Sequence, residues 1–100
     1  MINLTSILIL FGGPSYEHDV SCLSAKTILT YIDKNKYKIT PVGIDKYNDW
    51  YIYKDDISLL DSNWTTKKIE KIHNIISFLK RFDKITVKLV PTYFLVMIIT

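Results

Sequence analysis

The sequence predicts a single α/β domain with a mostly parallel sheet, on the strength of three observations. A continuous apolar run from Ser6 to Phe11 is typical of a strand that is covered on both faces. Gly12-Gly13-Pro14 then permits a tight turn, and a helical pattern precedes a second strand. The 100 residues, 48% of them hydrophobic, suffice for one core and leave no length for a second domain.

A helix is expected directly after the glycine turn. Ser15 is a suitable N-cap residue, and Glu17 and Asp19 would then lie in the first turn, where carboxylates interact favourably with the helix dipole. Four apolar residues at roughly helical spacing form the expected buried stripe: Val20, Leu23, Ile28 and Ile32. The polar residues 33–35 are expected to end the helix.

The second strand is expected from Tyr37 to Asp45. Pro41 cannot donate a ladder hydrogen bond, so we expect a fault or an edge position there. Residues 47–49 predict a turn, and the aromatic segment from Trp50 to Tyr53 predicts a short strand or hairpin arm. The first strand, the helix and the second strand together make one βαβ unit, whose crossover should be right-handed.

The second half of the chain has a less distinct pattern. Isoleucines and other apolar residues at helical spacing predict a helix from about Thr66 to Phe82. Residues 83–90 and 92–99 are further candidate strands.

Composition and charge exclude several classes of protein. A net charge of +3 that comes from twelve lysines and only one arginine argues against a nucleic-acid partner. Cys22 is the single cysteine, which excludes a disulfide framework and a four-cysteine zinc site, and no metal-ligand spacing is recognisable. The apolar residues 93–99 are far fewer than the ~20 that a membrane span needs. We therefore expect a cytoplasmic protein that binds neither membranes nor nucleic acid.

The residues around the glycine turn are the candidates for chemistry. Ligands of open α/β sheets bind at the carboxyl ends of the strands, and Glu17, Ser21 and Ser24 would share one helix face there. A carboxylate in this place can hold a substrate ammonium, with Ser21 orienting it. Gly12 and Gly13 would allow a close approach of the backbone, although neither G-x-G-x-x-G nor a P-loop is present. The alternative is that Glu17 only stabilises the helix dipole and that His18 is a surface or capping residue.

Residues 11–25 match the pattern F-G-G-x-S-x-E-H-x-V-S-x-x-S-A at ten positions. This segment closely resembles the N-terminal signature of D-alanine–D-alanine ligases. The continuation from Asp33 to Tyr51 is similar to the family's D-x-x-K-Y-x-x-x-P-x-G-I … W-Y pattern, so the resemblance covers roughly residues 4–64. Residues 49–53 and the pair Asn63-Trp64 also look like the vancomycin-resistance branch, which makes D-alanyl-D-serine.

The resemblance implies a Rossmann-like pre-ATP-grasp domain over residues 1–84, which ends before the ATP-grasp domains. It implies an ATP-dependent carbon–nitrogen ligase that makes the D-alanyl-D-alanine dipeptide for peptidoglycan. By the same resemblance Glu17 contacts the ammonium group of the first D-alanine, and Ser21 lies close to that site. Val20 would form a wall for the substrate methyl group, and His18 is a further candidate for the substrate site.

Residues 85–100 form an atypical apolar tail that departs from the family, whose H-G-x-x-G-E-D-G segment is not found. The abrupt apolar end suggests a truncated or frame-disrupted gene product, or a separately encoded fragment. The tail should be a poorly supported apolar edge, so that truncation after Val90 improves solubility.

The ATP-binding lysines and magnesium carboxylates of the family belong to its later domains. ATP and Mg²⁺ are thus implied for the complete enzyme only, and the chain alone should bind no cofactor or metal and be inactive. Its partners would be D-alanine as substrate in the complete enzyme and either the missing ATP-grasp domains or a homodimer partner. The alternative is a non-catalytic Rossmann-like fragment that binds a small molecule or another protein.

Overall fold

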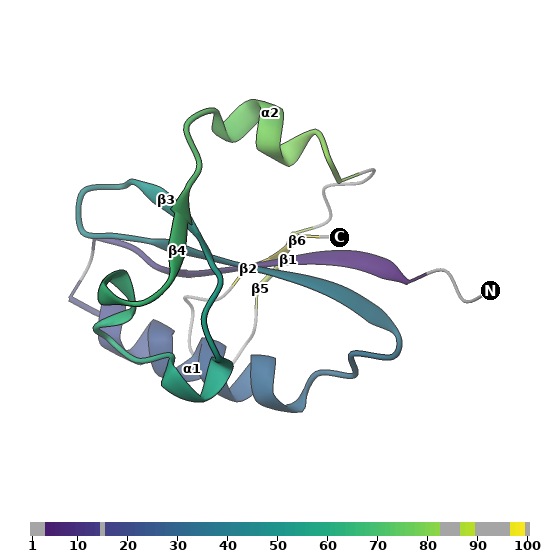
Figure 1. The fold of residues 1–100 in the computed structure, drawn as a ribbon, viewed down its shortest axis with the longest axis horizontal. Coiled ribbons are helices and arrows are strands. Elements are labelled where there is room, and N and C mark those ends of the chain that lie inside the picture. Colours follow the sequence, from purple (N-terminus) through teal and green to yellow (C-terminus); the bar gives the residue numbers. More distant parts are fainter. Residues whose placement is uncertain (1–3, 15, 83–86, 90–96, 100) are drawn as a thin grey trace.

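The computed structural model describes residues 4–14, 16–82, 87–89 and 97–99. Its strands form one sheet with the order β4-β3-β2-β1-β6-β5, and α1 and α2 lie on opposite sides of this sheet (Figure 1). The elements are, in chain order, β1 (Thr5–Gly12), α1 (His18–Tyr31), β2 (Tyr37–Ile44), β3 (Trp50–Tyr53), the 3₁₀ helices η1 (Ile57–Leu59) and η2 (Trp64–Thr66), β4 (Ile69–Lys71), α2 (Ile75–Leu79), β5 (Val87–Leu89) and β6 (Met97–Ile99).

Strand β1 is the centre of the fold, and its apolar run is buried on both faces as the sequence predicted. Ile7, Ile9 and Phe11 belong to the core beneath α1. Leu8 and Leu10 belong to a second core, which Phe78 and Phe82 close from the side of α2. Each strand position therefore serves one of two cores, which explains why β1 shows no alternation of apolar and polar residues.

The α/β class is confirmed, but the expectation of a mostly parallel sheet is wrong. Among the described strands only β1 and β2 pair in parallel, from Thr5 opposite Tyr37 to Gly12 opposite Ile44. The β1–β6, β2–β3, β3–β4 and β5–β6 pairs are antiparallel. For the β2–β3 and β5–β6 pairs the physical reason is connection length, because a parallel neighbour needs a long crossover whereas short links give antiparallel pairs.

The link between β2 and β3 shows this effect. The carboxylate of Asp45 accepts hydrogen bonds from the backbone N–H groups of Tyr47 at 2.8 Å and Asp49 at 3.0 Å, and Asn48 has a φ of 66°. This is the predicted turn, and it returns the chain at once into β3. Pro41 lies in β2 opposite Ile9, before the β3 pairing begins at Val42, so the expected edge position is confirmed on that side of the strand.

Helix α1 begins later than expected. The N-cap position is Glu17, which places this residue outside the first turn, whereas Ser15 lies outside the described residues. The predicted stripe is wrong at its start, because Val20 and Leu23 are exposed. The buried face consists instead of His18, Ser21, Cys22, Ala25 and Leu29. Small residues on this face allow the helix to pack closely on β1, which hydrophobicity alone did not indicate.

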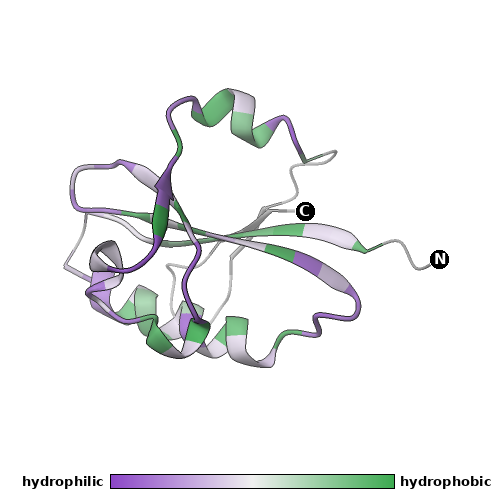
Figure 2. Cartoon of the chain, viewed as in Figure 1, coloured by the Kyte–Doolittle hydropathy of each residue, from purple (hydrophilic) through white to green (hydrophobic). Residues whose placement is uncertain are grey.

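The predicted helix over 66–82 is wrong. The segment forms the end of η2, then β4, then the short α2, which Figure 2 shows as largely hydrophobic. Strand β4 pairs with β3, and a new helix starts where the Asn74 side chain accepts a hydrogen bond from the Ser77 N–H at 3.0 Å. Strand pairing therefore overrode the isoleucine spacing, because residues 69–71 complete the sheet edge beside β3.

The apolar tail contributes two of the strands. Strands β5 and β6 fall within the two segments expected to be strands, and their remaining residues lie outside the described part of the chain. Strand β6 pairs with the central strand, placing Ile99 opposite Leu8 and Met97 opposite Leu10. Residues 97–99 are thus part of the sheet and not an unsupported edge, which corrects the expectation from the sequence. Within the described residues, no helix is long and apolar enough to cross a membrane.

Candidate functional site

A hollow of about 650 Å³ lies beyond the carboxyl ends of β1 and β2. It is open to solvent and is bounded by the glycine turn, the start of α1, the β2–β3 turn and the loop before η2. The described residues that line it are Pro14, Tyr16, His18, Asp19, Lys46, Ser62 and Asn63. This is the edge where the sequence predicted a ligand site. One carboxylate, from Asp19, and one ammonium group, from Lys46, supply its charged groups.

The glycine turn needs glycine at its first position for two reasons. Gly12 has a φ of 88°, and a Cβ atom added there would lie 2.4 Å from the backbone oxygen of Ile44. The Gly12 N–H donates to the hydroxyl oxygen of Ser21 at 2.9 Å, and the Gly13 N–H donates to the Ile44 carbonyl at 2.7 Å. Because both amide groups are hydrogen-bonded inside the chain, this turn does not offer them to a phosphate group.

His18 is buried, with 8% of its surface exposed, so the interpretation as a surface or capping residue is wrong. Its Nδ1 lies 2.7 Å from the Gly13 carbonyl oxygen, and the Trp64 indole Nε1–H donates to its Nε2 over 3.1 Å. An indole N–H can only donate, so Nε2 is the acceptor and the ring proton is on Nδ1, donated to Gly13. Both ring nitrogens of this neutral imidazole are thereby engaged by the chain itself.

The three other predicted substrate residues do not line the hollow in the described structure. Glu17 is exposed at the N-cap between two lining residues, and its carbonyl oxygen accepts the Ser21 N–H at 3.0 Å. Ser21 is fully buried, and its hydroxyl group holds Gly12. Val20 is 46% exposed on the outer part of the helix. The substrate roles of Glu17 and Val20 stay predictions, and Ser21 has a clear structural role.

Trp64 was not among the site residues indicated by the sequence. It is completely buried and packs against Gly43, where an added Cβ atom would lie 2.6 Å from the indole ring. Its ring also makes edge-to-face contacts with Phe11 and Tyr51, with centroid distances of 5.4 and 5.9 Å. A glycine inside a strand often marks the close approach of another group. Gly43 was therefore the signal in the sequence that a large side chain packs against β2.

Cys22 is not suited to be a nucleophile. Burial, reinforced by the nearby carboxylates of Asp19 and Asp61, raises the pKa of its thiol from 9.0 to about 12. The nearby Trp64 side chain acts in the opposite direction but is the smaller effect. The thiol is therefore protonated at neutral pH and packs as a small apolar group.

The described residues do not fit ATP or Mg²⁺. The two glycine N–H groups that a phosphate would use are occupied, as shown above. No group of three or more His, Cys, Asp or Glu side chains in the described parts of the chain is arranged to hold a metal ion. The donor set for nucleotide and metal is thus not found in these residues, and we derive no chemical step through either group.

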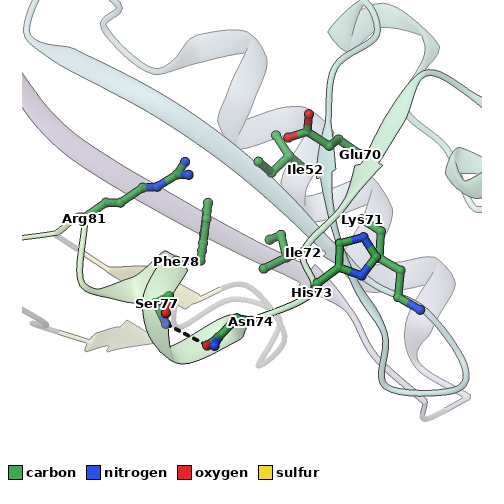
Figure 3. Close-up of a pocket in the computed structure, with 9 residues that line it drawn as sticks. All are labelled: Ile52, Glu70, Lys71, Ile72, His73, Asn74, Ser77, Phe78 and Arg81. Atoms are coloured by element: carbon green, nitrogen blue, oxygen red, sulfur yellow. Dashed lines mark hydrogen bonds between the residues drawn. The ribbon is translucent and has the colours of Figure 1, made fainter.

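A second hollow, of about 260 Å³, lies on the opposite face of the sheet between β4 and α2 (Figure 3). Its lining includes Ile52, Phe78 and the cation Arg81, whose guanidinium lies 5.4 Å from the centre of the Phe78 ring. Its lining contains none of the residues that the sequence indicated for the site.

The fold and the site together define an α/β domain of the Rossmann-like kind, with a ligand-sized hollow at the carboxyl edge of a parallel strand pair. The family model described as "D-ala D-ala ligase N-terminus" matches residues 6–94. The chain belongs to this family. The match extends beyond residue 84 into the segment that the sequence analysis set apart as an atypical tail.

Individual relatives agree with this assignment. The chain is 47% identical over 64 residues to the D-alanine–D-alanine ligase of Caldicellulosiruptor bescii, covering 64% of this chain and 18% of the relative. It is 45% identical over 67 residues to that of Thermoanaerobacter sp. (strain X514), covering 66% and 19%. The crystal structure of the VanG D-Ala:D-Ser ligase from Enterococcus faecalis superposes with a TM-score of 0.60 and 34% identity, covering 64% and 19%. The chain thus spans about a fifth of the length of the relatives it matches.

Proposed function

We propose that this chain is the N-terminal substrate-binding part of an ATP-dependent D-alanine–D-alanine ligase, which acts in the cytoplasm in peptidoglycan synthesis. The observation that carries the proposal is the hollow at the carboxyl end of β1, one side of which comes from the signature segment 11–25 and includes His18. The identity of 47% with a relative named D-alanine–D-alanine ligase supports the same activity. D-alanine is the proposed substrate.

In this proposal Glu17 binds the ammonium group of the first D-alanine. The residue is exposed and lies between Tyr16 and His18, both of which line the hollow. Ser21 contributes by holding Gly12 and thereby the shape of the turn. Val20 is proposed as a wall near the substrate methyl group. The rest of the pocket, with ATP and Mg²⁺, belongs to the part of the ligase that this chain does not span.

The decisive experiment uses a chimera in which residues 1–82 replace the equivalent part of a complete ligase. Glu17→Gln removes a charge-assisted contact worth ~1.5–3 kcal/mol, so KM for the first D-alanine should rise roughly ten- to a hundredfold. Glu70→Gln is the matched control, because Glu70 is an exposed acid on β4 that pairs with Lys54 at 3.2 Å. Steady-state kinetics measures both. Equal behaviour of the two variants would show that Glu17 is not the ammonium ligand.

The chain of 100 residues should be inactive by itself. Because its described residues supply no donor set for nucleotide or metal, we expect neither ATP hydrolysis nor dipeptide formation when it is incubated with ATP, Mg²⁺ and D-alanine. Phosphate release and chromatography of the products measure this. Phosphate release that depends on D-alanine would contradict the proposal. Binding of D-alanine without turnover, measured by calorimetry, would agree both with a substrate-binding part of a ligase and with a non-catalytic small-molecule binder, and the chimera distinguishes the two.

A further inference from the structure

The hollow at the carboxyl edge has two sides that come from distant parts of the sequence. We call Pro14, Tyr16, His18 and Asp19 the glycine-turn side, and Ser62 and Asn63 the loop side. The glycine-turn side includes the first two residues of α1, whereas the loop side is a turn that belongs to no strand or helix. What joins them determines how wide the hollow is.

The hydrogen bond between His18 and Trp64 joins the two sides. Trp64 follows Asn63 directly, and its indole N–H reaches the imidazole of a residue 46 positions earlier. The two ring planes are nearly parallel, with an angle of 14° between them. On its other edge the imidazole holds the Gly13 carbonyl at 2.7 Å. One continuous chain of hydrogen bonds thus runs from the loop side through His18 into the glycine turn.

The Trp64 end of this link is firmly seated. The indole is completely buried and lies against Gly43 with no room for even a methyl group between them. The loop before it is held by a backbone hydrogen bond from the Trp64 N–H to the Asp61 carbonyl, 3.1 Å long. A buried, directional bond between two packed rings tolerates little change in length or angle, so a shift of either side would break it.

We propose that His18 and Trp64 are positioning residues that set the distance between the glycine-turn side and the loop side, and so the shape of the substrate hollow. The inference rests on the proposed function for its purpose, since the hollow is the proposed amino-acid site. His18 acts here through the backbone of Gly13 and not as an acid or base, because both of its nitrogens are engaged within the chain.

The first test is the tautomer of His18 in the whole chain of 100 residues. Long-range ¹H–¹⁵N NMR at about pH 8, where an ordinary histidine is neutral, should show the proton of His18 on Nδ1 and an acceptor Nε2. His73, which is exposed, is the internal reference. A proton on Nε2 of His18 would overturn the proposal, because the Trp64 bond could not then exist.

The second test removes the indole N–H but keeps an aromatic ring. Trp64→Phe should shift the backbone amide NMR signals on both sides of the hollow, namely those of Gly13, Tyr16, Ser62 and Asn63. His18 should then no longer be restricted to the tautomer with its proton on Nδ1. Trp50→Phe is the matched control, because Trp50 is half-buried and packs against the other core. If Trp64→Phe leaves the His18 ring and the glycine turn unchanged, the proposal is wrong. If this variant does not fold, the tautomer of the unaltered chain still decides.

The third test asks whether the link matters for substrate. In the ligase chimera, Trp64→Phe should raise KM for the first D-alanine about two- to tenfold with kcat little changed, as expected for the loss of one net hydrogen bond that shapes the site. Unchanged KM would refute the positioning role. The NMR result does not depend on ligase activity. An intact Nδ1–H tautomer in a chimera without any ligase activity would therefore count against the proposed function and not against the link.

Discussion

Both ring nitrogens of His18 and the hydroxyl group of Ser21 are hydrogen-bonded to the glycine turn or to Trp64. Two residues that look catalytic in the sequence therefore shape the backbone of the site. Glu17 lies exposed at the N-cap and is the residue proposed to bind the substrate ammonium group. The signature residues thus divide into Glu17 and Val20, which are proposed to meet substrate, and His18 and Ser21, which hold the glycine turn.

Two buried acids of high pKa predict how stability depends on pH. Burial raises the pKa of Cys22 from 9.0 to about 12, and burial with the nearby Asp55 carboxylate raises the pKa of Tyr53 from 10.0 to about 12. Both groups hold their protons more tightly in the folded chain than in the unfolded chain. Their contribution to stability is thus complete below pH 9 and is lost as the pH rises toward 12.

Urea titrations at increasing pH should therefore show a falling free energy of unfolding over this alkaline range. Cys22→Ala and Tyr53→Phe should each make the slope against pH less steep, and the double variant should flatten it further. Each substitution also lowers stability at neutral pH, by loss of packing or of the 2.8 Å hydrogen bond from the Tyr53 hydroxyl to the Asp56 carbonyl, so the slope is the relevant quantity. A slope unaffected by both substitutions would contradict the assigned burial effects.

At the scale of elements, the glycine turn connects β1 to α1 through two glycines that differ in how much room a side chain would have. Gly12 and Gly13 both have positive φ, of 88° and 101°. A Cβ atom on Gly13 would meet nothing within 4 Å, whereas one on Gly12 would collide with the Ile44 backbone and the His18 ring. The turn is therefore held tightly on the side of β2 and is open on the side of the hollow.

This difference predicts unequal effects of two alanine substitutions. Gly13→Ala should cost ~1–2 kcal/mol, from the left-handed backbone alone. Gly12→Ala should cost a further ~1–3 kcal/mol, because the strand end or the imidazole must move. Chemical denaturation of the two variants measures the difference, with Gly13→Ala serving as the control for backbone strain. Equal losses would show that the contact with Ile44 and His18 is not restrictive.

At the scale of the whole molecule, the sheet depends on both ends of the sequence. Strand β6 lies beside β1, and β5 joins the sheet through β6. Truncation after Val90 removes β6 and leaves the β1 backbone from Leu8 to Leu10 without its antiparallel neighbour. An unpaired edge in an apolar strand favours aggregation. The expectation from the sequence, that this truncation improves solubility, is therefore reversed.

The truncated chain 1–90 should melt at a lower temperature and elute partly as aggregate. Circular dichroism and size-exclusion chromatography measure the two effects. Removal of Thr100 alone is the control, because it shortens the chain without touching the β1–β6 pairs. A monomeric 1–90 chain with an unchanged melting temperature would show that β6 adds nothing to the fold.

The sequence by itself determined the features that depend on neighbouring residues. The apolar run of β1, the glycine turn and the aspartate-bounded turn after β2 are local, and all lie where predicted. The signature of residues 11–25 was also sufficient to predict the family. These features are decided by backbone conformation and short-range hydrogen bonds, which a sequence displays directly.

Tertiary structure alone decided the rest. The isoleucines of 69–76 became a strand, a turn and a short helix because β3 offered an edge to pair with. The buried face of α1 contains His18 and Ser21 in place of Val20 and Leu23, since the helix rests on a glycine turn whose backbone needs hydrogen-bonding partners. The link from His18 to Trp64 spans 46 positions, and no local pattern records such a contact. Contacts between distant residues can satisfy buried polar groups in ways that local propensity does not encode. For this reason the sequence alone did not predict which residues form the two sides of the hollow.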